Sequence, residues 1–177
     1  MEPRTLAEQR YIEVIGGKID ALKRHLIDQR MPEQDASTLD WYRFLLAMKE
    51  ISGNTSNAMS FVASLMAKEY LSARLSMRTF DVAAKAQGAP GLDIDEQTTD
   101  GKRVIAEIKT TIPYMANDLG AQQKTTFRKD FDKLRNTEAD FKFFFVTDDT
   151  VLRLMRGKYA PELASVMVVH LPTGAES

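Results

Sequence analysis

The sequence contains no cysteine, and this absence excludes several kinds of chemistry at once. Without thiols the chain has no disulfide, no thiolate zinc site and no cysteine nucleophile, which fits a protein of the reducing cytoplasm. The sequence also lacks any apolar run near the ~20 residues that cross a bilayer. Its first residues, Met-Glu-Pro-Arg-Thr, do not have the pattern of a secretory signal. We therefore expect a cytoplasmic protein with no membrane contact.

A strong net charge is missing too, because 24 basic and 25 acidic residues leave a formal charge of −1. Proteins that coat nucleic acid nonspecifically are usually strongly basic, so this class is disfavoured. The charge is nevertheless uneven, since the span 102–135 holds eight basic residues against four acidic ones. The basic residues are Lys102, Arg103, Lys109, Lys124, Arg128, Lys129, Lys133 and Arg135. We expect this region to attract phosphate groups.

The remaining composition is ordinary for a globular fold, with 177 residues of which 44% are apolar and 28% charged. No internal repeat or low-complexity linker divides the chain. We predict a single domain over residues 1–177, with a helical N-terminal region at 1–56 and a core at 57–177.

Three helices are predicted in the first half of the chain. The first carries an apolar stripe at spacings of three and four residues, formed by Ile12, Ile15, Ile19, Leu22 and Leu26. The second begins after a cap at Ser37 or Thr38 and ends at Gly53, and the third runs from about residue 57 to 77. The stripe on the first helix can serve either internal packing or a partner helix.

Strands alternate with helices in the second half. The segment 91–111 reads as a strand, a tight turn at Thr99–Lys102 and a second strand. Further elements are a helix at 121–134, a buried central strand at 141–147, a helix at 150–156 that is capped by Asp148-Asp149, and a final strand at 166–171. This order predicts an α/β fold with a mixed central sheet flanked by helices.

The segment 91–111 carries the most informative side chains. Glu107 and Lys109 lie two residues apart in a strand, so they project from the same face. The turn folds the preceding strand, which carries Asp93 and Asp95, back against them. Two carboxylates and an ammonium group in one cleft are what a metal-dependent phosphodiesterase needs. The alternative is an exposed hairpin with a cross-strand ion pair.

These residues resemble the PD-(D/E)xK nuclease superfamily, which includes most type II restriction endonucleases and many DNA-repair nucleases. The matching residues are Asp93, within Gly91-Leu92-Asp93-Ile94, and the sequence Glu107-Ile108-Lys109, although Leu92 stands where the family usually has proline. The resemblance implies a restriction-endonuclease-like core and a Mg²⁺ ion held by Asp93, Glu107 and the Ile108 carbonyl, for which Mn²⁺ would substitute. Lys109 would contact the attacking water or the scissile phosphate. Asp95 competes with Asp93 for the role of first ligand.

Glu69 is a further candidate by the same resemblance. In many members of the superfamily a helix before the motif lends a glutamate to the metal site. Val62, Leu65 and Ala73 share the stripe of Glu69, so we expect its carboxylate to point toward the core. An ordinary salt bridge is the alternative.

The start of the helix after the Glu/Lys strand is the last candidate region. A helix N-terminus offers free N–H groups to an anion. Related nucleases often place a glutamine or a lysine at this point, and the residues here are Gln122, Gln123 and Lys124. A solvated polar first turn is the alternative for each of them.

The resemblance implies a Mg²⁺-dependent DNA endonuclease that acts on double-stranded DNA. A homodimer is expected, because one active site in each subunit cuts one strand. A type II restriction endonuclease is the first interpretation. A structure-specific repair or recombination nuclease is the second, and a non-catalytic DNA-binding protein of the same fold is the third.

Overall fold

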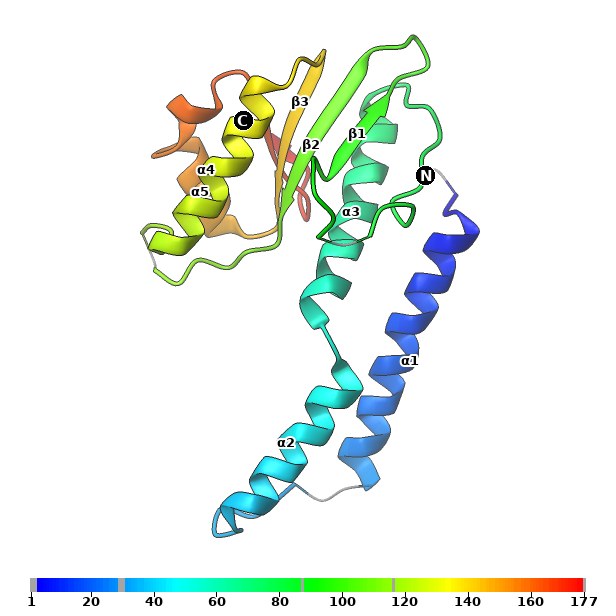
Figure 1. Cartoon of the computed structure of the whole chain (residues 1–177), viewed down its shortest axis with the longest axis vertical. Helices are drawn as coiled ribbons and strands as arrows, with labels where there is room; N and C mark the ends of the chain where they lie inside the picture. Colours follow the sequence, from blue (N-terminus) through cyan, green and yellow to red (C-terminus); the bar gives the residue numbers. More distant parts are fainter. Residues whose placement is uncertain (1–2, 29–30, 87, 116, 177) are drawn as a thin grey trace. The chain divides into compact units, whose positions relative to one another are not determined.

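The computed structural model describes residues 3–28, 31–86, 88–115 and 117–176. The chain divides into two compact units, one formed by Arg4–Ala58 and the other by Met59–Ser177 with Met1–Pro3. Helices α1 and α2 belong to the first unit, and the sheet with its helices belongs to the second (Figure 1). The boundary lies two residues beyond the division expected at residue 56.

The first unit contains α1 (Leu6–Asp28) and α2 (Thr38–Ser52), which pack against each other. Ser37 caps α2 because its hydroxyl oxygen accepts a hydrogen bond from the Asp40 N–H. Gly53 ends α2 with a φ of 59°, in the left-handed region that favours glycine. The cap and the end predicted for this helix are both confirmed.

The apolar stripe of α1 is divided between two environments. Ile19 and Leu26 are 62% and 50% exposed, whereas the other members, Ile12, Ile15 and Leu22, are half-buried. Among the described residues of this unit, Phe44 of α2 is the only apolar side chain that is buried. Although α1 has 23 residues, neither it nor another described helix is apolar enough to span a membrane.

The second unit is built on a five-stranded sheet in the order β1-β2-β3-β4-β5. The strands are β1 (Ile94–Gln97), β2 (Arg103–Lys109), β3 (Phe141–Val146), β4 (Met167–His170) and β5 (Ala175–Glu176). The strands β2, β3 and β4 are parallel, and the two edge strands run antiparallel to their neighbours. The predicted mixed α/β sheet is therefore confirmed, with the aromatic strand β3 at its centre.

Helices cover both faces of this sheet (Figure 1). On one face lies α3 (Thr55–Arg74), whose first residues belong to the other unit; on the other lie α4 (Ala121–Asn136), α5 (Asp149–Arg156) and the short 3-10 helix η1 (Ala160–Leu163). Successive residues of β2 serve opposite faces. Ala106 packs in the core beneath α3, and Ile105 packs in the core beneath α4 and α5.

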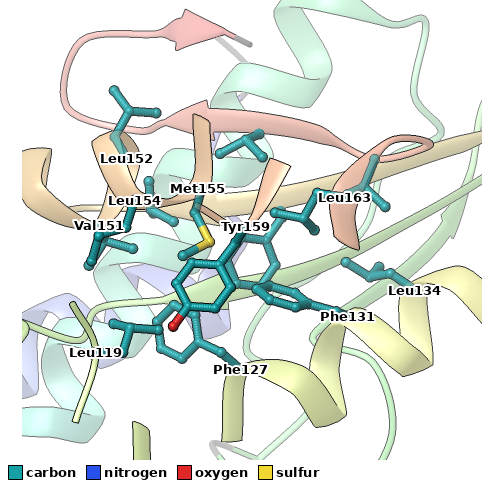
Figure 2. Close-up of a cluster of buried hydrophobic side chains, with 14 of the residues drawn as sticks. Leu119, Phe127, Phe131, Leu134, Val151, Leu152, Leu154, Met155, Tyr159 and Leu163 are labelled. Atoms are coloured by element: carbon teal, nitrogen blue, oxygen red, sulfur yellow. The ribbon is translucent and has the colours of Figure 1, made fainter. Parts of the chain in front are cut away.

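The core beneath α4 and α5 is rich in aromatic rings (Figure 2). The ring centroid of Phe131 lies 5.1 Å from that of Phe144 and 6.1 Å from that of Tyr159. The ring of Phe127 lies 5.7 Å from that of Phe144. These edge-to-face and tilted contacts stabilise the packing of α4 against β3. They also fix the rotation of α4 about its axis, and hence the direction of its polar side chains.

Two predicted boundaries differ from the structure. The third helix ends at Arg74 rather than near residue 77, because the following residues extend along the sheet edge, where the Arg78 N–H donates to the Gln97 carbonyl. The strand at 166–171 is not the last one. Gly174, with a φ of 69°, returns the chain so that the two residues of β5 pair with β4. Strand β5 was not predicted because two residues are too few to show the alternation of apolar and polar side chains that identifies a strand in a sequence.

Candidate active site

Glu107 and Lys109 project from the same face of β2, as the period of a strand predicts. They continue the face of Ile105, which lies beneath α4, and both side chains meet residues of that helix. The strand that carries them is internal, because β1 and β3 pair with its two edges. The Glu107 side chain is 3% exposed and that of Lys109 is 15% exposed. The alternative of a solvated hairpin is therefore wrong.

Asp93 lies directly before β1 and reaches the same end of β2. The antiparallel register pairs Ile94 with Ala106, and its continuation by one residue sets Asp93 opposite Glu107. The Ile108 N–H donates a hydrogen bond of 2.8 Å to Asp93 Oδ2. This bond holds the Asp93 carboxylate against the β2 backbone at the residue between Glu107 and Lys109.

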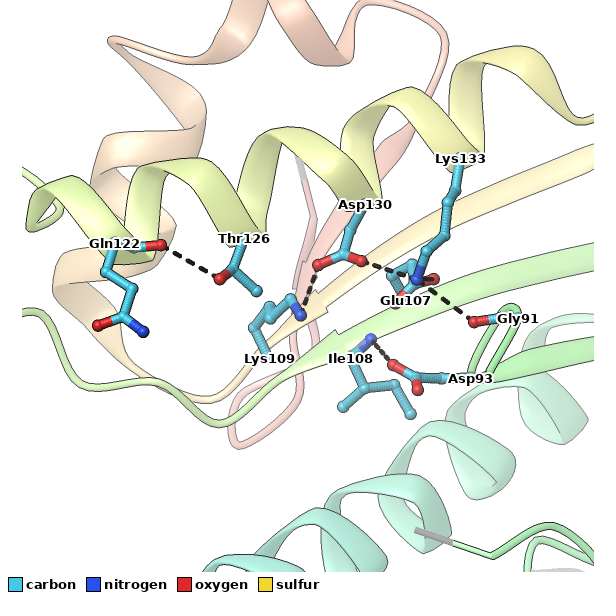
Figure 3. Close-up of polar contacts among 9 residues, drawn as sticks. All are labelled: Gly91, Asp93, Glu107, Ile108, Lys109, Gln122, Thr126, Asp130 and Lys133. Carbon is cyan, nitrogen blue, oxygen red and sulfur yellow. Dashed lines mark hydrogen bonds and ion pairs between the residues drawn. The ribbon is translucent and has the colours of Figure 1, made fainter. Parts of the chain in front are cut away.

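Two residues of α4, Asp130 and Lys133, join these side chains into one network (Figure 3). Asp130 lies between two ammonium groups, with Oδ2 at 2.6 Å from Lys109 Nζ and Oδ1 at 2.9 Å from Lys133 Nζ. The same Lys133 Nζ lies 3.0 Å from Glu107 Oε1 and donates to the Gly91 carbonyl at 3.3 Å. Gly91 has a φ of 101°, so a residue with a side chain would be strained there.

Carboxylates and ammonium groups are about equal in number at this site. Asp93, Glu107 and Asp130 stand beside Lys109 and Lys133, and a third ammonium group, that of Lys85, donates to the Leu92 carbonyl and lines a cavity with Asp93. Burial is the main cause that raises the pKa of Glu107 to about 7, the carboxylates of Asp93 and Asp130 act in the same direction, and Lys133 opposes them. Near neutral pH Glu107 is therefore close to half protonated, and a cation bound beside it would favour the ionised form.

Asp93 and Glu107 fit a magnesium site in ligand type and number. Mg²⁺ prefers oxygen ligands, keeps several of its waters and commonly takes only one or two protein carboxylates. No group of three or more acidic or histidine side chains that could hold a metal lies within the described parts of the chain. A pair of carboxylates is within the ligand number that Mg²⁺ takes.

Asp95 has a partner of its own. Arg103 Nε and Nη2 donate to the two carboxylate oxygens of Asp95 at 2.8 Å each, in the parallel geometry that suits this pair. The hydrogen bonds from Arg103 lower the pKa of Asp95. Of the two candidates for first ligand, the structure brings Asp93 beside Glu107 and leaves Asp95 in a cross-strand ion pair.

Glu69 does not point toward the core, and this expectation is wrong. Two members of its stripe, Val62 and Ala73, are exposed, while the neighbouring Lys68 is buried. Glu69 is half-buried and lines a pocket formed by residues 72–79. The α3 residue that shares a cavity with Asp93 is Ser64. The structure therefore does not group Glu69 with Asp93 and Glu107.

The three polar residues that open α4 have different surroundings. The Gln123 side chain accepts from the Gly120 N–H at 2.9 Å and donates to the Ile112 carbonyl at 2.9 Å, so it holds the preceding loop. Lys124 pairs with Asp118 at 2.6 Å. Gln122 is exposed, and no hydrogen bond of its side chain is found within the described residues. Gln122 is thus the member of the three that is free to meet a ligand.

Most of the basic residues counted between positions 102 and 135 are already paired. Seven of the eight make ion pairs with carboxylates. Within the described residues, Lys129 is the exception. The positive charge expected around the motif is therefore largely neutralised within the protein, and a phosphate would have to exchange with carboxylates at exposed pairs.

Asp130 and Lys133 were not among the residues predicted from the motif. The signal that could have found them is the apolar stripe of α4, because Asp130 lies between Phe127, Phe131 and Leu134 on the buried side of that helix. A buried carboxylate needs a cationic partner. Lys133 follows at the i+3 position that allows such a pair.

Comparisons with models of protein families, with curated proteins and with solved structures found no match for this chain. The interpretation of the site therefore depends on the positions and charges of its own residues. The features that carry it are the carboxylates of Asp93, directly before β1, and of Glu107, near the end of β2, with the Lys109 ammonium group on the same face of β2.

Proposed function

We propose that this protein is a Mg²⁺-dependent DNA endonuclease of the PD-(D/E)xK superfamily, which hydrolyses phosphodiester bonds. The observation that carries the proposal is the convergence of Asp93, Glu107 and Lys109 at one end of β2. A mixed sheet with helices on both faces is compatible with a restriction-endonuclease-like core. Among such enzymes, we favour a type II restriction endonuclease.

The roles of the residues follow from their positions. Asp93 and Glu107 would hold Mg²⁺ together with the Ile108 carbonyl, and the bound ion would activate a water and offset charge on the phosphate. The Ile108 N–H keeps Asp93 in place for this task. Lys109 would contact the attacking water or the scissile phosphate. Asp130 orients the Lys109 ammonium group through their 2.6 Å ion pair.

Double-stranded DNA is the partner in this proposal, and a second copy of the chain is needed so that both strands are cut. The support for a second copy comes from the helical unit. In its described residues Phe44 is the only buried apolar side chain, while Ile19 and Leu26 are at least half exposed. Ile19 and Leu26 lie seven residues apart, and therefore on the same side of α1, where a helix of a second copy could cover them.

Cleavage of supercoiled plasmid with Mg²⁺ tests the proposal. Glu107→Ala and Lys109→Ala should each slow cleavage by several orders of magnitude, because both side chains have direct roles. Glu138→Ala and Lys102→Ala remove the same charges from exposed positions and serve as matched controls. If Glu107→Ala or Lys109→Ala cut at the rate of its control, the active-site assignment would be wrong.

A second pair of variants decides between the two aspartates. Asp93→Asn should abolish cleavage, and Asp95→Asn should retain it, because Asp95 is bound to Arg103. The products distinguish the alternatives. Discrete fragments indicate a restriction enzyme, and cutting confined to branched DNA indicates a repair or recombination nuclease. DNA that is bound but left intact with Mg²⁺ and with Mn²⁺ would overturn the proposal in favour of a non-catalytic protein.

A further inference from the structure

The ammonium group of Lys133 occupies a small cation site. Three oxygens converge on Lys133 Nζ, namely Asp130 Oδ1 at 2.9 Å, Glu107 Oε1 at 3.0 Å and the Gly91 carbonyl at 3.3 Å. An ammonium group has three donors, so this arrangement can satisfy all of them. One of these oxygens belongs to a residue that we propose as a metal ligand, and Gly91 lies two residues before the other, Asp93.

Lys133 differs from its partners in exposure. Its side chain is 42% exposed, while those of Glu107 and Asp130 are 3% and 6% exposed. The carboxylates are therefore fixed in the protein interior, whereas the lysine enters from the solvent side on a long and flexible stem. Partial burial alone would lower the pKa of Lys133, but its hydrogen bonds to Asp130 and Glu107 raise it, so the group carries a full positive charge.

A divalent ion and an ammonium group cannot share the same carboxylate oxygen without strong repulsion at such short range. We infer that Lys133 is a built-in competitor for the metal, which holds Glu107 in the metal-free protein and leaves it when a divalent ion binds. Once it is displaced, the ammonium group is free to contact a DNA phosphate. This inference rests on the proposed function, because it takes Glu107 as a metal ligand.

The competing explanation is structural, since the same ion pair joins α4 to β2. In that case loss of Lys133 would weaken the fold and leave metal affinity unchanged. The two explanations differ in the property that loss of Lys133 changes: the structural one predicts lower stability of the fold, and competition predicts higher metal affinity. Competition predicts that removal of a cation from the site increases the affinity for another cation at the same carboxylate.

Titration of the DNA-free protein with Mn²⁺ separates these explanations when it is followed by electron paramagnetic resonance at one pH well above 7, where Glu107 is ionised in wild type and variant. Lys133→Met keeps the apolar stem and removes the charge. It should bind Mn²⁺ about tenfold more tightly than the wild type, because a tenfold change in Kd corresponds to the usual free energy of one hydrogen bond between charged groups. Lys129→Met is the matched control, because Lys129 is exposed, lies one turn earlier on α4 and has no ion pair among the described residues. It should change Mn²⁺ affinity by less than about twofold, since long-range charge effects are screened.

A DNA-binding measurement tests the released ammonium group. In Ca²⁺, Lys133→Met should lower the slope of log Kd against log salt by about one, the value expected for one lost phosphate contact. Without a divalent ion the slope should equal that of the wild type, because Lys133 is then bound to Glu107. If Lys133→Met lowers the slope equally under both conditions, the displacement step is refuted.

The outcomes separate failure of this inference from failure of the proposed function. If the wild type binds Mn²⁺ and Glu107→Gln does not, but Lys133→Met binds no more tightly than Lys129→Met, the metal site stands and the competition is refuted. If the wild type binds no Mn²⁺ at millimolar concentration, the proposed metal site itself fails. Should Lys133→Met not fold, Lys133→Gln removes the same charge with a polar side chain, and the same comparison applies to it.

Discussion

Replacement of Glu107 by glutamine should change how the stability of the metal-free core depends on pH. The pKa of Glu107 is raised from 4.5 to about 7 in the folded protein, mainly by burial. A carboxyl group with a raised pKa in the folded state favours folding only while it is protonated. As the pH rises through the folded pKa, the wild-type protein must ionise a buried group and loses stability. Glutamine has no charge to gain, so the variant should not show this loss.

The magnitude follows from the same pKa. A rise from 4.5 to about 7 corresponds to about 3 kcal/mol of stability that is lost by pH 8. Relative to the wild type, Glu107→Gln should therefore gain about 3 kcal/mol between pH 4.5 and pH 8. This is a large effect for a domain whose total stability is about 5–15 kcal/mol.

The assay has to report on the second unit. The single tryptophan, Trp41, lies in α2 of the helical unit, so its fluorescence does not follow the sheet. Hydrogen exchange of the β3 amides in EDTA measures the opening free energy of the core directly. Exchange rates of wild type and variant are compared at each pH, because the intrinsic chemistry then cancels.

The exposed Glu138 provides the control, since Glu138→Gln removes the same charge without burial. Its exchange should follow that of the wild type at every pH. A Glu107→Gln protein whose advantage over the wild type stays constant from pH 4.5 to pH 8 would refute the reasoning. It would mean that Lys133 stabilises the ionised Glu107 as well as water does.

Three other predictions use separate features of the chain. Mg²⁺ or Mn²⁺ should support cleavage of DNA. Ca²⁺ should support DNA binding with little hydrolysis, because its looser coordination positions the attacking water poorly. Cleavage that survives EDTA would rule out the proposed mechanism. Glutamate at Ile19 and Leu22 should lower the molecular mass seen by light scattering and convert double-strand cutting into nicking, whereas a wild type that is monomeric and still makes double-strand breaks would refute the dimer. Hydrogen bonds from Lys124 and Lys158 hold the pKa of Asp118 below its usual range, so Asp118→Asn should lower the melting temperature at pH 7. The difference from the wild type should shrink as the pH falls below about 4, where the carboxylate begins to be protonated. An unchanged melting temperature at pH 7 would show that these ion pairs of Asp118 do not stabilise the fold.

Local signals in the sequence were sufficient for most of the secondary structure. Ser37 and Asp148 cap α2 and α5 as expected, because a cap acts on N–H groups two or three residues away. The run of phenylalanines at β3 predicted a central strand for a similar reason, since a strand buried on both faces is apolar throughout. The alternation along β2 placed Glu107 and Lys109 on one face. Each of these inferences needs only neighbouring residues.

The contacts that complete the site were beyond such reasoning. The ion pairs of Asp130 and Lys133 with β2 depend on how α4 is rotated, and that rotation is fixed by rings that α4 meets across the sheet. Glu69 shows the same limit. A helix turns about 100° per residue, so a stripe assigned one residue out of phase exchanges a buried position for an exposed one. In α3 the buried position belongs to Lys68.

The strand that positions Asp93 has a consequence for how the site fails on heating. Strand β1 has four residues and lies at the edge of the sheet, whereas Glu107 and Lys109 belong to an internal strand. Edge strands fray at lower free energy than the strands between them. Separation of β1 from β2 would remove Asp93 and leave the other two residues in place. Under the proposed function, fraying of this one short strand would set the upper temperature limit of cleavage, and cleavage should end before the sheet melts.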